Sequence, residues 1–264
     1  MRRREPKARN DASPHGDDHA LALEAATRAG TVLRALRSDP ALVGERLGRA
    51  GDRQANAAIV QLLRRERPGD ALLSEELKPD DRRLAQRRVW IVDPLDGTRE
   101  FSEAGARSDW AVHVALCVDG VPVVAVVLLP AIGELWTSAQ RRAVPAAPAG
   151  RWRIAVSRTR APALVLRVAD KLGAEVVPMG SAGAKTAAVL RGEVHAYLHA
   201  GGMHEWDTCA PVAVALAHGL HASRLDGRAC RYNCPEPVTP DLLVCRPECV
   251  AGLLAATAEL AQST

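Results

Sequence analysis

The sequence has few aromatic side chains, few lysines and no long apolar stretch. Aromatic residues make up 3% of its 264 residues, and only four of its 35 basic residues are lysines. A membrane-spanning helix needs about 18 consecutive apolar residues, and no run approaches that length. The basic opening MRRREPKARND leads into SPHGDDHA rather than into an apolar segment, so we do not expect it to act as a secretory signal. We therefore expect a cytoplasmic protein with no membrane partner.

The basic residues are not interleaved with aromatic ones, although the formal net charge is +4. Proteins that bind nucleic-acid polymers usually combine basic and aromatic side chains on one surface. The excess of arginine over lysine is instead typical of GC-rich genomes. We predict no nucleic-acid polymer as a partner, whereas a small anionic molecule is still a candidate ligand.

The cysteines form no common zinc-binding pattern. Four of them make two C-x3-C pairs, Cys230 with Cys234 and Cys245 with Cys249. Structural zinc sites often use pairs separated by two or four residues, with glycine in the knuckle. Because Cys245 ends an apolar run, we predict ordinary thiols in a reducing compartment and no zinc site.

Hydrophobic periodicity divides the chain into two halves that both mix helices and strands. We predict a disordered arm over residues 1–18, an N-terminal half over residues 19–143 and a C-terminal half over residues 151–264. The predicted helices cover residues 19–37, 50–66, 163–172, 183–191, 207–218 and 248–262. The predicted strands cover residues 88–92, 111–118, 121–130, 133–138, 153–156, 175–177, 194–199 and 241–245, with a hairpin turn at 119–120. Such alternation indicates a layered α/β architecture.

Two carboxylates follow a buried strand in the stretch WIVDPLDGT, residues 90–98. Pro94 keeps Asp93 extended, and Gly97 allows a sharp turn. Acids at the end of a strand suit hard divalent cations, which take oxygen ligands. The amides of Gly97 and Thr98 at the start of a short helix suit a phosphate oxygen. The alternative is a plain turn capped by Asp93, and the pattern alone leaves both interpretations open.

Further acids lie elsewhere in the chain. Glu75 and Glu76 follow an apolar pair, and Asp207 follows Glu205 at a predicted helix start. Aspartate is also a common helix cap, so Asp207 and Asp52 each have a purely structural alternative.

These motifs together resemble those of the inositol monophosphatase superfamily. They are Glu75-Glu76, the DPLDGT of residues 93–98 and the WDTCAP of residues 206–211. The resemblance covers residues 19–262. It implies a layered αβαβα sugar-phosphatase fold and a magnesium-dependent, lithium-sensitive phosphomonoesterase that acts on a small phosphorylated molecule.

Within that superfamily, the chain is most similar to CysQ-type 3'-phosphoadenosine 5'-phosphate phosphatases. The similarity lies in GDRQAN, DPLDGTREF, GSAGAK and HASRLDG, and TREF stands where inositol phosphatases usually carry T-x-N-F. It implies hydrolysis of 3'-phosphoadenosine 5'-phosphate to AMP and phosphate, in sulfate assimilation. The alternatives are a broader phosphatase of inositol 1-phosphate or fructose 1,6-bisphosphate, and a non-catalytic nucleotide sensor, which would not need both Asp52 and Thr98. Many relatives are dimers, so a homodimer is one expected state.

The resemblance also implies a role for each matching residue. Two to three Mg²⁺ ions would be held by Glu75, Asp93, the carbonyl of Leu95, Asp96 and Asp207. The catalytic residues would be Asp52, Thr98 and Glu75, of which the first two would orient and deprotonate the attacking water. Five carboxylates so close together would repel one another without cations.

A glycine-rich run, GSAGAK at residues 180–185, precedes a predicted helix and can present amides to a phosphate. It is one residue longer than the Gly-Ser-x-x-Lys of many nucleotide phosphatases. Its simpler interpretation is a loop with Ser181 as the helix cap. The implied substrate-binding residues are Gly97, Thr98, Arg99, Gly180, Ser181 and Lys185. His204, beside the WD motif, is expected to line the substrate pocket rather than to bind metal.

Overall fold

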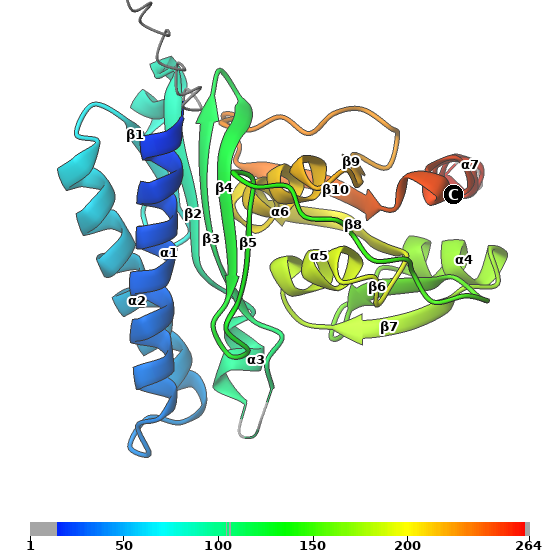
Figure 1. Cartoon of the computed structure of the whole chain (residues 1–264), viewed down its shortest axis with the longest axis horizontal. Helices are drawn as coiled ribbons and strands as arrows, with labels where there is room; N and C mark the ends of the chain where they lie inside the picture. The colour runs from blue at the N-terminus through cyan, green and yellow to red at the C-terminus, as the bar shows by residue number, and fades with distance from the viewer. Residues whose placement is uncertain (1–14, 104, 106, 262–264) are drawn as a thin grey trace, which may run out of the picture.

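The computed structural model describes residues 15–103, 105 and 107–261. Helices alternate with two five-stranded sheets (Figure 1). The helices are α1 (Gly16–Arg37), α2 (Gly44–Glu66), α3 (Thr98–Ser102), α4 (Ala163–Lys171), α5 (Ala182–Leu190), α6 (Glu205–Ala217) and α7 (Val250–Ala261), with the 3-10 helices η1 (Asp81–Ala85) and η2 (Pro247–Cys249). The strands are β1 (Ala71–Ser74), β2 (Arg88–Asp96), β3 (Ala111–Val118), β4 (Val121–Leu129), β5 (Glu134–Thr137), β6 (Arg153–Ser157), β7 (Glu175–Met179), β8 (Ala196–His204), β9 (His221–Ser223) and β10 (Val238–Cys245).

The first sheet is covered by helices on both faces. Its order is β1-β2-β3-β4-β5, with β1 and β2 parallel and the other pairs antiparallel. Successive residues of a strand point to opposite faces. Trp90 and Val92 of β2 therefore pack with α1 and α2, whereas Val89 and Ile91 pack toward α5 and α6. Burial on both faces explains why this strand reads as a continuous apolar run.

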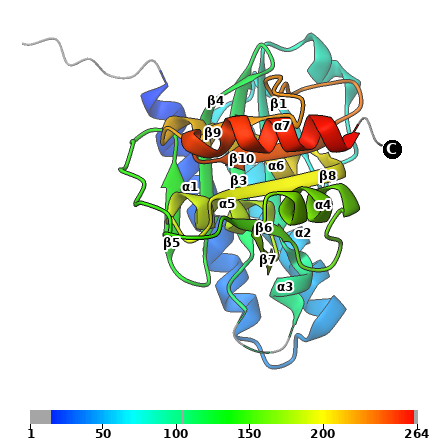
Figure 2. The ribbon, with the colours of Figure 1, turned by 90° about the vertical axis from the view of Figure 1, so that its right-hand side faces the viewer.

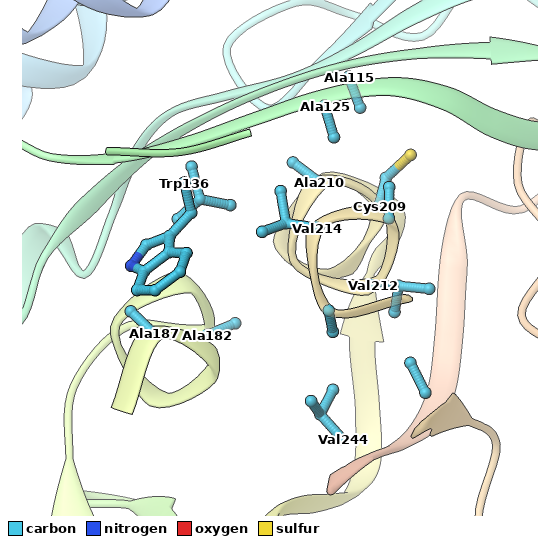
Figure 3. Close-up of a cluster of buried hydrophobic side chains, with 14 of the residues drawn as sticks. Ala115, Ala125, Trp136, Ala182, Ala187, Cys209, Ala210, Val212, Val214 and Val244 are labelled. Carbon is cyan, nitrogen blue, oxygen red and sulfur yellow. The ribbon is translucent and has the colours of Figure 1, made fainter. Parts of the chain in front are cut away.

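The second sheet has the order β7-β6-β8-β10-β9, and β6 runs parallel to both β7 and β8. Helices α4 and α7 cover its outer face (Figure 2). Helices α5 and α6 lie between the two sheets, where small side chains such as Ala187 and Ala210 let them approach (Figure 3). Trp136 of β5 fills the space beside α5 and α6. The predicted layered αβαβα fold is therefore confirmed.

Most predicted elements are present with shifted ends. The predicted hairpin turn is confirmed, and Asp119 and Gly120 both have positive φ, at 51° and 77°. Helix α2 starts earlier than predicted, at Gly44, and β8 continues to His204. The short strands β1 and β9 were not predicted, because three or four residues are too few to show a period.

The predicted ends of the chain differ in part from the structure. Residues 1–14 of the predicted arm lie outside the described residues. Residues 16–18 were also predicted to be disordered, but they belong to α1. The buried Asp18 forms ion pairs with Arg67 and Arg88 there. The predicted last helix is divided into η2 and α7, since Pro247 begins a 3-10 turn. Among the residues that the structure describes, no helix combines the length and the hydrophobicity of a membrane-spanning segment.

Candidate active site

The carboxyl end of β2 places two acids close together. The pairing of β2 with β3 shifts register between Asp93 and Asp96, where Pro94 interrupts the ladder. The backbone N–H of Leu95 donates to Asp93 Oδ1 at 3.0 Å, which orients that carboxylate. Gly97 then has a φ of 89°, which favours glycine, and α3 begins at Thr98. The predicted strand–turn–helix arrangement is thus observed.

Two other segments bring acids to the same place. Strand β1 runs parallel to β2 with Ser74 opposite Val92, so Glu75 lies beside Asp93. Asp207 lies in the first turn of α6, where its Oδ2 accepts from the backbone N–H of His204 at 2.8 Å. Carboxylate oxygens of Asp93, Asp96 and Asp207 all lie within 4.8 Å of one another. The cluster therefore joins residues that are far apart in the sequence.

The electrostatics of this cluster favour a bound cation. Burial, with the charges of Glu75, Asp96 and Asp207, holds the pKa of Asp93 well above its usual value. Desolvation in the cleft raises the pKa of Glu75 to about 8, and nearby carboxylates add to the rise. Burial and Asp96 raise the pKa of Asp207 to about 7. Buried, mutually repelling oxygen donors of this kind fit a hard divalent cation such as Mg²⁺.

Two groups donate hydrogen bonds to one oxygen of Asp96, and a histidine lies beside the same oxygen. Asp96 Oδ2 accepts from the Ser181 hydroxyl and from the Gly183 N–H at 2.9 Å. His113 Nε2 lies 3.3 Å from the same oxygen, and burial lowers the pKa of that histidine. Asp96 Oδ1 is left for the cluster. Ser181 also accepts from the Ala184 N–H, so it caps α5, as in the simpler interpretation of the glycine-rich run.

His113 was not predicted from the sequence. It is the polar residue in the apolar run AVHVALC, and it is fully buried on β3. Its Nδ1 lies 3.3 Å from the carbonyl oxygen of Trp206, so the ring lies between Asp96 and the first turn of α6. A histidine on the inward face of an otherwise apolar strand was the available signal.

Asp52 and Thr98 form a second polar group behind the acids. Asp52 lies on α2, and the glycine before it lets that helix approach β2 and α3, since a Cβ on Gly51 would lie 2.8 Å from Leu95 and Phe101. Thr98 Oγ1 is 3.1 Å from both Asp52 Oδ1 and the Leu95 carbonyl oxygen. Burial raises the pKa of Asp52 to about 6.

A cleft of about 510 Å³ opens over the acidic cluster. Its lining includes the residues predicted for metal and substrate, namely Glu75, Asp93, Leu95, Asp96, Gly97, Thr98, Arg99, Gly180, Ser181, Lys185 and Asp207. Asp52 does not line it and reaches it through Thr98. The cleft thus brings the predicted site residues of both halves of the chain together.

The basic side chains around the cleft differ in whether they already bind other groups of the protein. Lys185 is buried, donates to the Gly180 carbonyl at 3.2 Å and lies over the Tyr197 ring. Arg158 binds Glu100 at 2.8 Å and also Glu103. Arg99 and Arg160 are exposed on the rim.

The mouth of the cleft also carries a flat aromatic surface. The His204 ring stacks on the Trp206 ring, with centroids 4.4 Å apart and an angle of 7° between the planes. His204 lines the cleft, and 56% of its side chain is exposed. A planar ligand can therefore reach the open face of this ring.

The cysteines lie away from the cleft. Cys117 and Cys209 are buried with their sulfurs 3.3 Å apart, and Cys245 and Cys249 are also buried. Cys230 and Cys234 are partly exposed. That they bind no zinc stays a prediction.

Comparisons with known proteins give one family. The sequence model of the inositol monophosphatase family matches residues 18–263. A protein of Mycobacterium bovis named 3'-phosphoadenosine 5'-phosphate phosphatase is 53% identical over 81% of this chain and 82% of its own. A protein of that name from Mycobacterium leprae is 48% identical over 93% and 95% of the two chains. The 3'(2'),5'-bisphosphate nucleotidase CysQ of Escherichia coli is 30% identical over 70% and 78%.

Solved structures show the same fold. CysQ of Bacteroides thetaiotaomicron superposes with a TM-score of 0.76 at 26% identity, covering 87% of this chain and 97% of that one. An inositol monophosphatase from Anabaena has a TM-score of 0.73 at 23% identity, covering 92% and 96%. The layered fold is therefore common to these proteins.

Proposed function

The chain belongs to the inositol monophosphatase family, and we propose that it is a magnesium-dependent phosphatase that converts 3'-phosphoadenosine 5'-phosphate to AMP and phosphate. The observation that carries this proposal is the cleft, where an acidic cluster lies beside a cationic rim and a flat aromatic ring. Relatives 48–53% identical carry the name of this activity. Hydrolysis of phosphoric monoesters is accordingly the reaction class, and the nucleotide is the proposed substrate.

The acids would hold two to three Mg²⁺ ions. Their ligands would be Glu75, Asp93, the Leu95 carbonyl, Asp96 and Asp207, which offer only oxygen atoms. When bound, the ions would supply activation of water and stabilisation of the leaving oxygen. The chain's own part is to hold the ligands, with Asp93 central and almost fully buried.

Asp52 and Thr98 would orient the attacking water and accept its proton. Thr98 lies at the cleft wall, and its hydroxyl proton can be donated to Asp52. A base works best when its pKa is near the working pH, and the pKa of Asp52 is raised to about 6. Glu75, whose pKa is raised further, also lines the cleft and would assist as the remaining catalytic acid or base.

The rest of the cleft would recognise the nucleotide. The phosphate being cleaved belongs at the acidic cluster, near the amides of Gly97 and Thr98. The second phosphate needs another cation, and Arg99 and Arg160 on the rim would provide it, because Arg158 is already bound by two glutamates. The adenine would stack on His204. Gly180, Ser181 and Lys185 would shape the wall between these subsites, with Lys185 supporting it from a buried position.

The test is a comparison of substrates. We expect kcat/KM for the bisphosphate to exceed that for inositol 1-phosphate by about 10- to 100-fold, since each charge-assisted hydrogen bond contributes roughly 1.5–3 kcal/mol. Arg160→Ala should lower the bisphosphate value selectively. Arg64→Ala, on the exposed surface of α2, is the matched control.

Three results would overturn parts of the proposal. Equal values, or a preference for inositol 1-phosphate or fructose 1,6-bisphosphate, would overturn the nucleotide assignment and leave phosphatase activity standing. Turnover that is unaffected by removing Mg²⁺ with a chelator would overturn the metal assignment. No turnover of any of these esters would favour a nucleotide sensor instead.

A further inference from the structure

Three polar residues outside the cleft are bound to one another beside the start of α6. We propose that these residues, Arg83, Asn233 and Glu205, form a bracket that positions the carboxylate of Asp207 for metal binding. The inference rests on the metal role proposed above for Asp207. None of the three lines the cleft, so they are positioning residues and not catalytic ones.

Arg83 and Asn233 bind each other in both directions. Arg83 is only 2% exposed, and its Nη1 donates to Asn233 Oδ1 at 2.7 Å. The Asn233 side-chain amide donates back to the Arg83 carbonyl at 3.0 Å. Arg83 Nη2 also donates to the carbonyls of Cys234 and Pro235, at 2.7 and 3.1 Å. The loop of residues 233–235 is therefore fixed to η1.

The same loop holds the first turn of α6 through Glu205. This carboxylate is fully buried, and it accepts from the backbone N–H groups of Asn233 and Cys234 at 2.7 and 2.8 Å. The Glu205 N–H donates to the Pro237 carbonyl at 2.9 Å. Both oxygens of Glu205 are thus engaged, so it is not a free metal ligand. It anchors the turn that carries Asp207 two residues later.

The bracket also connects two segments that supply metal ligands. The chain passes from Glu75 into η1, which carries Arg83, while Asp207 follows Glu205 on α6. A shift of α6 relative to η1 would change the separation of these two carboxylates. Hydrogen bonds of this kind fix direction as well as distance, and groups that orient metal ligands commonly change metal affinity about 10- to 100-fold when removed.

The test is a calorimetric titration in which Mg²⁺ alone is added to chelator-treated protein and the dissociation constant is measured. Glu205→Gln keeps the side chain's shape but turns one acceptor into a donor that faces an N–H group. We expect it to weaken Mg²⁺ binding about 10-fold or more. Asn233→Gly is a milder second variant, because a φ of 61° suits glycine and the backbone N–H to Glu205 is kept. We expect it to weaken binding about 3-fold or more.

Glu134→Gln is the matched control. Glu134 on β5 also accepts two N–H groups, from Trp136 at 2.7 Å and Arg191 at 2.6 Å, and it does not line the cleft. Its variant should lower the melting temperature without changing Mg²⁺ affinity. In the two bracket variants, raising Mg²⁺ should restore most of the turnover.

The outcomes separate this inference from the proposed function. Mg²⁺ affinity within about 2-fold of the wild-type value in both folded bracket variants would overturn the inference, even if their melting temperatures fall. Equal loss of affinity in Glu134→Gln would overturn it as well. A wild-type chain that binds no Mg²⁺ would instead overturn the proposed metal site itself.

Discussion

Replacing Asp96 with asparagine should remove nearly all magnesium-dependent turnover while the fold survives. Asp96 Oδ2 accepts from the Ser181 hydroxyl and the Gly183 N–H, which leaves Oδ1 for the acidic cluster. An amide offers one acceptor and one NH₂ group. Its one oxygen can either accept the hydrogen bonds from Ser181 and Gly183 or face the acidic cluster as a metal ligand, but it cannot do both.

The structure indicates which arrangement the variant adopts. Turning the NH₂ group toward Ser181 and Gly183 would place it against the Gly183 N–H donor and would forfeit hydrogen bonds that the amide oxygen can keep, at about 0.5–1.5 kcal/mol each for a neutral acceptor. The oxygen should therefore stay with those donors, and the NH₂ group should face the cluster, where nitrogen carrying two hydrogens cannot bind Mg²⁺. We expect kcat/KM to fall on the order of 100-fold or more, which corresponds to about 2.7 kcal/mol of transition-state stabilisation.

The assay is phosphate release from 3'-phosphoadenosine 5'-phosphate across a Mg²⁺ titration, with circular dichroism to check folding. Asp70→Asn is the matched control, because Asp70 accepts from Arg88 and Trp90 at the opposite end of β2 and does not line the cleft. If Asp96→Asn turns over within about 3-fold of the wild type at equal Mg²⁺, the ligand assignment is wrong.

The free energy of unfolding of the metal-free protein should fall as the pH rises from about 4 to about 8. The pKa values of Glu75 and Asp207 are raised to about 8 and about 7 in the folded chain, which therefore keeps protons that the unfolded chain has already lost. Thermal melts in chelator test this, and a pH-independent melting temperature would contradict it; added Mg²⁺ should stabilise more at the alkaline end. Thr98→Val should lower kcat on the order of 100-fold with Mg²⁺ affinity unchanged, and equal losses in both would argue against a role in proton transfer. Millimolar Li⁺ should inhibit turnover, and insensitivity would count against the family mechanism. Elemental analysis should find no stoichiometric zinc, and a variant with serine at all four C-x3-C cysteines that loses both zinc and its fold would refute that expectation.

The sequence was informative where local chemistry decides the structure. Pro94 and Gly97 constrain the backbone on either side of Asp96, so the bend after β2 could be predicted from the residues alone. The hairpin at Asp119 and Gly120 is of the same kind. The apolar run of β2 predicted a buried strand, and the helices on both sides of the sheet confirm it.

Contacts between distant segments could not be predicted in this way. Glu75 and Glu205 are both acids at the edge of an apolar segment, yet Glu75 lines the cleft and Glu205 is fully buried under backbone N–H groups. The difference depends on the loop of residues 233–235, which is joined to α6 only in the folded chain. His113 is similar, because its neighbour Asp96 is adjacent only through strand pairing and the local shift of register.

The way in which the acids are held explains how the cluster stays ready for a cation. Asp93 accepts from the Leu95 N–H, Asp96 from the Gly183 N–H and Asp207 from the His204 N–H. Backbone amides orient a carboxylate and leave its negative charge in place, whereas an arginine would neutralise it. In this arginine-rich chain, no Arg or Lys of the described residues comes within 4.0 Å of these three carboxylates, although Arg158 pairs with Glu100 nearby. Since no described arginine or lysine pairs directly with these acids, a bound cation can take the place of their protons, and affinity for Mg²⁺ follows from carboxylates that the fold has oriented and left unpaired.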